Sequence, residues 1–301
     1  MKTLIFLVFL CTGSGLVVQA QQRGDAWATY ALTGSVRSFK TETATVVVKD
    51  GQPVEGPHVV QMTAEFDENG NRTDFGMYNQ DGVLVRRIVE RFDGPRMVEF
   101  INYDGSGNAW LRGTQDYDAN GRIVEQMTYN GDKSLRSKKV YIRNDQGQVV
   151  EWAEYAANGV VLDKMTNTFT AAGRPNTSER EQRAPNGVLV SREFHDGPQQ
   201  LVEIVTYKPD GSVLSKSVRV AQQISEYAAD GSLRKSTTIS SQGRLPDSIT
   251  VDPSGTRKRE SQIPDQVDSH GNWTKQTKWM TDANGTRAVT VTYRTITYYE
   301  K

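Results

Sequence analysis

Four tryptophans are the residues whose type and placement best fit a chemical role. Trp110 and Trp273 follow Gly-Asn pairs, in GNAW and GNW, while Trp152 and Trp279 stand beside charged residues. An exposed ring can bind the apolar C–H face of a sugar while neighbouring Asn, Arg or Glu side chains bind its hydroxyls. We therefore predict a glycan-binding role for all four; the alternative is that the rings pin strand register or pack against the next repeat.

Residues for catalysis or metal binding are sparse. His58, His195 and His270 lie in separate segments without paired-ligand spacing, and Cys11 is the only cysteine. No serine elbow of the G-x-S-x-G kind follows the N-terminal segment, and the acidic turns lack the pattern of a calcium loop. The sequence predicts no catalytic residue, no metal, no cofactor and no enzyme activity.

One enzymatic alternative stays open. Two carboxylates of a glycoside hydrolase need only meet in space, so spacing along the chain does not exclude them. Glu90, Glu99, Glu125 and Glu203 fit the solvent face of strands more simply.

Composition removes partners that recognise charge. The 301 residues hold 36 basic and 36 acidic side chains, so no net field attracts nucleic acid. Only 36% of the residues are hydrophobic, which indicates a thin or one-sided core.

The first twenty residues have the pattern of a secretory signal. Lys2 precedes an apolar run, Leu4 to Leu10, and small residues end at Ala20. We expect residues 1–20 to be removed, leaving a mature chain without cysteine and without a transmembrane segment. An exported protein of this length with no disulfide favours a large repetitive sheet in the periplasm or outside the cell.

A glycine ladder runs through the rest of the chain. Its steps average about 13 residues between Gly70 and Gly285, and eleven of its seventeen glycines follow Asn or Asp directly. The seventeen are Gly70, Gly82, Gly94, Gly107, Gly121, Gly131, Gly147, Gly159, Gly173, Gly187, Gly197, Gly211, Gly231, Gly243, Gly255, Gly271 and Gly285. Asx-Gly pairs tolerate positive φ and mark hairpin turns.

Between the turns the chain alternates with a period of two. MVEFINY, from Met97 to Tyr103, and RAVTVTY, from Arg287 to Tyr293, are examples. The fold class is therefore all-β: an antiparallel meander in an open twisted or spiralling sheet. We expect residues 21–62 to form a capping segment and residues 63–301 the repeat domain.

The turn residues resemble a known family. Tyr117 to Arg122 (YDANGR) and Tyr103-Asp104 are similar to the tyrosine-aspartate (YD) repeat of RHS-type proteins. Leu32 to Ser38 (LTGSVRS) and Asp268 to Thr274 (DSHGNWT) resemble the ends of short exported bacterial YD-repeat proteins. The resemblance implies a β-repeat scaffold outside the cytoplasm.

The expected function is that of a non-enzymatic scaffold or binding protein of the bacterial cell envelope, contacting a glycan or an envelope protein. Self-association through sheet edges is a further expectation. The alternatives are a secreted polysaccharide hydrolase with paired carboxylates, and a module of the immunity or inhibitor type that binds a protein partner.

Overall fold

The computed structural model describes residues 29–198, 200–240, 247–251, 256–283 and 285–300. The predicted signal segment, residues 1–20 with Cys11, lies outside the described residues. The ladder glycines Gly243 and Gly255 do so as well.

Twenty-one strands account for most of the described chain. They are β1 (Val36–Lys49), β2 (Gln52–Glu55), β3 (Val59–Phe66), β4 (Arg72–Tyr78), β5 (Leu84–Asp93), β6 (Arg96–Asp104), β7 (Ala109–Tyr117), β8 (Ile123–Asn130), β9 (Leu135–Arg143), β10 (Val149–Ala156), β11 (Val161–Phe169), β12 (Pro175–Arg183), β13 (Leu189–Asp196), β14 (Leu201–Tyr207), β15 (Val213–Val220), β16 (Gln223–Ala228), β17 (Leu233–Ser240), β18 (Asp247–Val251), β19 (Arg257–Val267), β20 (Trp273–Asp282) and β21 (Gly285–Tyr298). No helix among the described residues is long and apolar enough to cross a membrane.

Most ladder glycines lie at the left-handed position of a three-residue hairpin loop. At one such turn Asp104 N donates to Asn108 O and Gly107 N donates to Asp104 O, both at 3.0 Å, and Gly107 has φ +83°. The Asp104 carboxylate accepts from the backbone N–H groups of Ser106 and Asn108, at 2.9 Å each. Thirteen of the fifteen described ladder glycines have positive φ, but no described Asn or Asp directly before one of them does. The Asn or Asp side chain that stabilises such a turn therefore belongs to the first residue of the turn, and not to the residue directly before the glycine.

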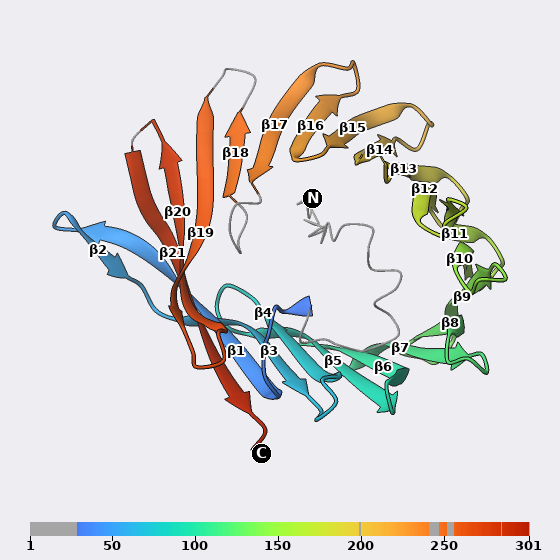
Figure 1. Cartoon of the computed structure of the whole chain (residues 1–301), viewed down its shortest axis with the longest axis horizontal. Coiled ribbons are helices and arrows are strands. Elements are labelled where there is room, and N and C mark those ends of the chain that lie inside the picture. Colours follow the sequence, from blue (N-terminus) through green and yellow to red (C-terminus); the bar gives the residue numbers. More distant parts are fainter. Residues whose placement is uncertain (1–28, 199, 241–246, 252–255, 284, 301) are drawn as a thin grey trace.

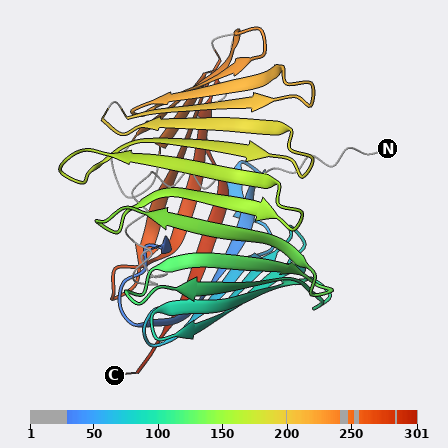
Figure 2. The same ribbon diagram turned by 90° about the vertical axis from the view of Figure 1, so that its right-hand side faces the viewer.

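The sheet closes into a barrel, so the prediction of an open twisted or spiralling sheet is wrong. Each strand from β3 to β21 pairs with the next, and β1 lies between β21 and β3 (Figure 1). The closed antiparallel meander contains twenty strands, while β2 pairs only with β1. Figure 2 shows the strands from β9 to β17 side by side along the wall. Closure depends on contacts between residues about 250 positions apart, which a local repeat does not reveal.

The first described residues, the turn before β20 and the last strand form the seam of this barrel. Asn272 accepts a hydrogen bond from Thr33 N at 2.7 Å and donates to Thr33 O and Tyr298 OH, both at 2.8 Å. His270 stacks on Tyr298 with ring centroids 4.0 Å apart, and Tyr299 N donates to Ser35 O at 2.9 Å. The two motifs that resemble the ends of YD-repeat proteins therefore meet at the point of closure.

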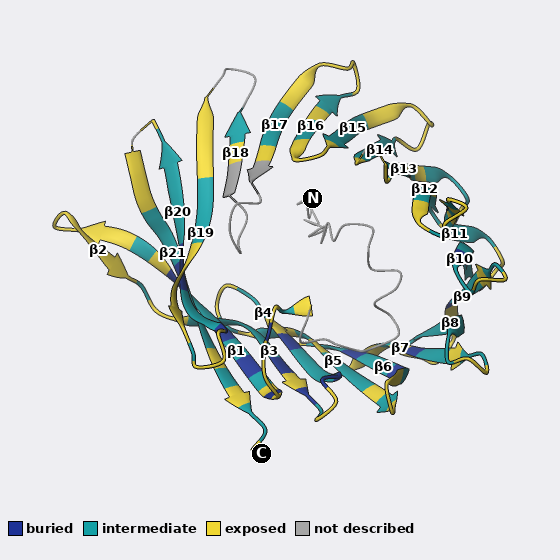
Figure 3. Ribbon diagram, in the orientation of Figure 1, coloured by how far each residue is buried: buried dark blue, intermediate teal, exposed yellow. Residues whose placement is uncertain are grey.

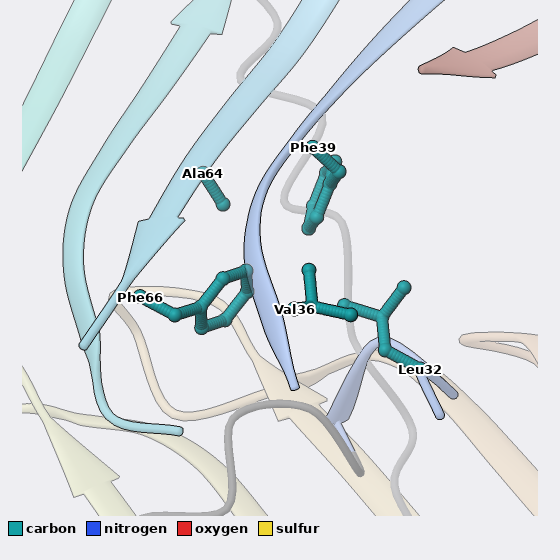
Figure 4. Packing of buried hydrophobic residues seen from close by; sticks show 5 residues of the cluster. All are labelled: Leu32, Val36, Phe39, Ala64 and Phe66. Carbon is teal, nitrogen blue, oxygen red and sulfur yellow. The ribbon is translucent and has the colours of Figure 1, made fainter. Parts of the chain in front are cut away.

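The hydrophobic core lies beside the seam. Leu32, Val36, Phe39, Ala64 and Phe66 form it, each no more than 7% exposed (Figure 4). Tyr30 caps the cluster from the segment ahead of β1, with its ring centroid 5.0 Å from that of Phe39. Most of the remaining wall is intermediate or exposed (Figure 3), as expected for a single sheet. The core is small because, among the described residues, one layer of strands has no second layer to pack against along most of its length.

The face that Tyr30 covers is the inner face of the barrel, since the described segment ahead of β1 lies within the ring (Figure 1). Following the register from Phe39 through Ala64, Phe75 and Ile88 assigns the inward-facing residue of each later strand. The opposite, outer face carries seven ion pairs between neighbouring strands from β4 to β15. These pairs are Asp74 with Arg87, Glu99 with Arg91 and Arg112, Glu125 with Lys138, Glu151 with Lys164, Glu181 with Arg192, and Glu203 with Lys216. Exposed pairs stabilise little individually, but opposite charges on neighbouring strands favour the observed register.

Candidate functional site

The densest group of charged and aromatic side chains on the inner face lies on β9 to β13. Its members share the inward position on strands that pair one after another, which brings residues up to 56 positions apart into one patch. We call this patch the inner-wall cluster: Lys139, Tyr141, Trp152, Glu154, Asp163, Arg180, Glu193 and His195. Of these, Trp152 was predicted from the sequence as a site residue. The signal for the others was the alternation of side chains along each strand, which places every second residue of neighbouring strands on the same face.

On one side of the cluster, hydrogen bonds and ion pairs link the side chains into a chain. Arg180 Nη2 donates to the Asp163 carboxylate at 2.6 Å, and Gln182 Nε2 donates to the same oxygen at 3.2 Å. Arg180 also lies 3.9 Å from Glu193, which contacts His195 at 2.5 Å. The hydrogen bond to Asp163 raises the pKa of Arg180, with burial opposing it. Each of these side chains therefore has a polar partner within the cluster.

The other side of the cluster has unfilled hydrogen-bonding capacity. Lys139 Nζ lies 3.4 Å from the centroid of Trp152, whose Nε1 donates to Met165 Sδ at 3.2 Å. Within the described chain, neither Lys139, the Tyr141 hydroxyl nor the Glu154 carboxylate makes a hydrogen bond. Burial lowers the pKa of Lys139 and raises that of Tyr141, since each charged form is poorly solvated there.

The other three predicted tryptophans lie apart from this cluster. The Arg294 guanidinium covers Trp273, with Cζ 3.7 Å from the ring centroid. Trp110 is 39% exposed, and Arg86 Cζ lies 5.8 Å from its ring. Trp279 is opposite Ser261 and Ala288 and, by the register, faces outward. The structure does not bring the four rings into one platform.

The four glutamates considered for the hydrolase alternative lie on different faces of the sheet. Glu90 is on the inner face, paired with Arg72, whereas Glu99, Glu125 and Glu203 belong to the outer ion pairs. No group of three or more His, Cys, Asp or Glu side chains in the described ranges is arranged to hold a metal ion.

Two pockets, of about 530 and 460 Å³, lie elsewhere on the described wall. The first is lined by Arg112 and Lys133 among others and by no carboxylate, and the second has Asp145 as its single carboxylate. Neither pocket holds the pair of carboxylates that a glycoside hydrolase needs. Glu154 and Asp163 of the inner-wall cluster are register partners on β10 and β11.

The Glu193–His195 contact predicts a measurable acid dependence. The hydrogen bond from His195 lowers the pKa of Glu193, as does the charge of Arg180, while burial opposes both. A carboxylate with a lowered folded pKa stabilises the fold above its unfolded pKa, near 4.5 here, and loses that contribution as pH falls through the folded value. When the pH falls from about 5.5 to about 3, the melting temperature of Glu193→Gln should therefore fall less than that of the wild type. Glu179→Gln, at an exposed position of the same hairpin, should follow the wild-type curve; identical curves for all three proteins would contradict the assignment.

Comparisons with known proteins give distant likeness in structure only. No protein family matches the sequence, and no curated protein matches it. A porin-like protein from Bacteroides uniformis is similar over 88% of this chain and 98% of its own, at 12% identity and a TM-score of 0.33. A second porin-like protein, from Bacteroides vulgatus, is similar over 89% of this chain and 100% of its own, at 9% identity and a TM-score of 0.23.

The TcdB2-TccC3 complex contains a chain that resembles 80% of this one with 17% of its own length, at 10% identity and a TM-score of 0.24. These scores are too low for the function of any of these proteins to be carried over. What the structure itself shows is a β-repeat protein; the likeness to YD-repeat proteins stays a prediction.

Proposed function

We propose that the protein is an exported, non-enzymatic binding protein of the cell envelope and that the inner-wall cluster binds a glycan. Export rests on the N-terminal signal pattern. The observation that carries the proposal is the set of partly buried polar groups with unfilled hydrogen bonds, Lys139, Tyr141 and Glu154, beside the ring of Trp152.

The chemistry of the cluster fits hydroxyl groups. A sugar hydroxyl donates one hydrogen bond and accepts others, and the cluster offers an ammonium donor, a carboxylate acceptor and a phenol that does both. Trp152 is not an open platform, because Lys139 lies over its ring. The aromatic side chains therefore shape the site, and the neighbouring polar groups supply recognition.

A glycan array of the purified chain, followed by titration of each hit, tests the proposal. Tyr141→Phe removes one hydroxyl and should weaken binding by roughly fivefold to tenfold, the cost of one hydrogen bond. Glu154→Gln should weaken it further, because hydrogen bonds to a charged group are stronger. Trp279→Phe, on the outer face, is the matched control and should bind as the wild type does.

Three outcomes would count against the proposal. Binding of no glycan would remove it, and so would a hit that Tyr141→Phe and Glu154→Gln leave unchanged. Release of new reducing ends from a bound oligosaccharide, lost in Glu154→Gln, would instead support the hydrolase alternative.

A further inference from the structure

A second feature of the inner face is an arginine that has no counter-ion among the described residues. Arg294, on β21, stacks against Trp273, and its Cζ also lies 5.3 Å from the centroid of Phe39. Its Nη1 donates a long hydrogen bond of 3.4 Å to Tyr30 O, whereas Nε is buried and has no partner. Burial lowers the pKa of Arg294 to about 10, and no carboxylate in the described residues offsets it.

An acceptor with the complementary need lies on the adjacent strand. Gln276, on β20, is 7% exposed, and its Oε1 is buried with no hydrogen-bond partner in the part of the chain that the structure describes. Gln276 is the register partner of Thr292, two residues before Arg294, so both side chains leave the same face of neighbouring strands. The Arg294 donor and the Gln276 acceptor, each without a partner among the described residues, are thus at neighbouring positions on the same face of the sheet.

Arg72 shows what such an arginine looks like when it is satisfied within the protein. It also lies on the inner face with its Cζ over a ring, 4.7 Å from the centroid of Phe75, and it donates to Tyr30 OH at 2.8 Å. Unlike Arg294, it forms an ion pair with a carboxylate, that of Glu90. Burying a cation without a counter-ion is costly, so the difference between the two arginines calls for an anionic ligand at Arg294.

We propose that Arg294, Gln276 and Trp273 form a binding site for a hydroxycarboxylate, such as a sugar acid. Because Arg294 Nε and Gln276 Oε1 are both buried, the two side chains turn toward the ligand on binding, and the carboxylate then accepts two hydrogen bonds from the Nε and Nη2 edge of Arg294. A hydroxyl beside that carboxylate donates to Gln276 Oε1. The site is on β20 and β21 and shares no residue with the inner-wall cluster, so it does not rest on the proposed glycan site.

Calorimetric titration of the full chain with three small probes tests this site. Galacturonate carries both groups, galactose lacks the carboxylate, and acetate lacks the hydroxyl. Galacturonate should bind, acetate should bind at least tenfold more weakly, and galactose should show no saturable binding at Arg294. Arg294→Met and Gln276→Leu should each weaken galacturonate binding at least tenfold, and Arg136→Met, at an exposed arginine of β9, should leave it unchanged.

A stability readout separates ligand binding from a purely structural role. Without ligand, Arg294→Met should melt no lower than the wild type, because it removes a buried charge that nothing in the described protein pairs. Arg294→Lys keeps the charge but cannot form the bidentate hydrogen bonds of a guanidinium, so it should also bind galacturonate at least tenfold more weakly.

Several results would overturn the inference: no binding of galacturonate, equal binding of galactose, or unchanged binding by Arg294→Met. A marked fall in the melting temperature of Arg294→Met would assign the arginine to the fold instead. Galacturonate binding that is lost in Tyr141→Phe but kept in Arg294→Met would place it at the inner-wall cluster and would likewise exclude this site.

Discussion

Asn272→Ala is expected to destabilise the protein by about 2–4 kcal/mol, because it leaves the backbone N–H and C=O of Thr33 without their partners at the seam. Asn272 is 1% exposed, so water cannot easily replace the lost hydrogen bonds. Its side chain also holds Tyr298 OH at 2.8 Å, and Tyr298 in turn donates to Asp268. Thermal or urea unfolding, followed by tryptophan fluorescence, measures the effect.

Two other asparagines serve as matched controls, because each follows the glycine of the same type of turn. Asn71 is also 1% exposed but bonds only to Asp67 and to Gly94 O, within neighbouring hairpins. Asn108 is exposed, and its side chain bonds to Asp104 alone. The expected order of destabilisation is Asn272→Ala first, then Asn71→Ala, then Asn108→Ala. An effect of Asn272→Ala no larger than that of Asn71→Ala would mean that the seam adds little to stability.

The strands and turns followed from local patterns, and for a physical reason. A hairpin turn needs a residue at positive φ, and glycine adopts it without strain, so the turns recur visibly as a ladder. Gly131 shows the limit of that reading: there the left-handed residue is Lys133, with φ +68°, and Gly131 instead allows close approach to Ala109 O. The glycine located the turn but not the residue that bends it.

Closure did not follow from the pattern. An open spiral and a closed barrel have the same alternation and the same turns, and they differ only in whether β1 pairs with β21. The motifs around Thr33 and Asn272 carried that information, but a hydrogen bond between residues 239 positions apart has no local signature.

The surroundings of the predicted tryptophans did not follow from the sequence. Exposed tryptophans were expected to act as sugar platforms, yet Trp152 and Trp273 each lie under a cation. A cation over an aromatic ring is favourable in itself, and sequence spacing does not show which strand supplies the cation. Lys139 is on the strand before Trp152, whereas Arg294 is on the strand after Trp273. Both pairings became visible only when the register was known.

Closure of the barrel also predicts a cross-link. Ser38 on β1 and Thr297 on β21 are register partners, with their hydroxyl oxygens 2.6 Å apart. In a Cys11→Ser background, Ser38→Cys/Thr297→Cys should form a disulfide on oxidation, seen as faster migration on a non-reducing gel. A loop of this length should stabilise the fold by up to about 5 kcal/mol, because the cross-link restricts the unfolded chain.

The matched control carries the same number of cysteines at positions that do not meet. Ser217, on β15, pairs with Ile204 and Glu226 and not with β1, so Ser38→Cys/Ser217→Cys should stay reduced under the same conditions. In an open sheet, β1 and β21 would be separated by the whole width of the sheet, and both double variants would stay reduced. Cross-linking that rises with protein concentration and gives dimers would instead show that β1 pairs with β21 of another copy. An intramolecular disulfide that raises the melting temperature is therefore the result that a closed barrel requires.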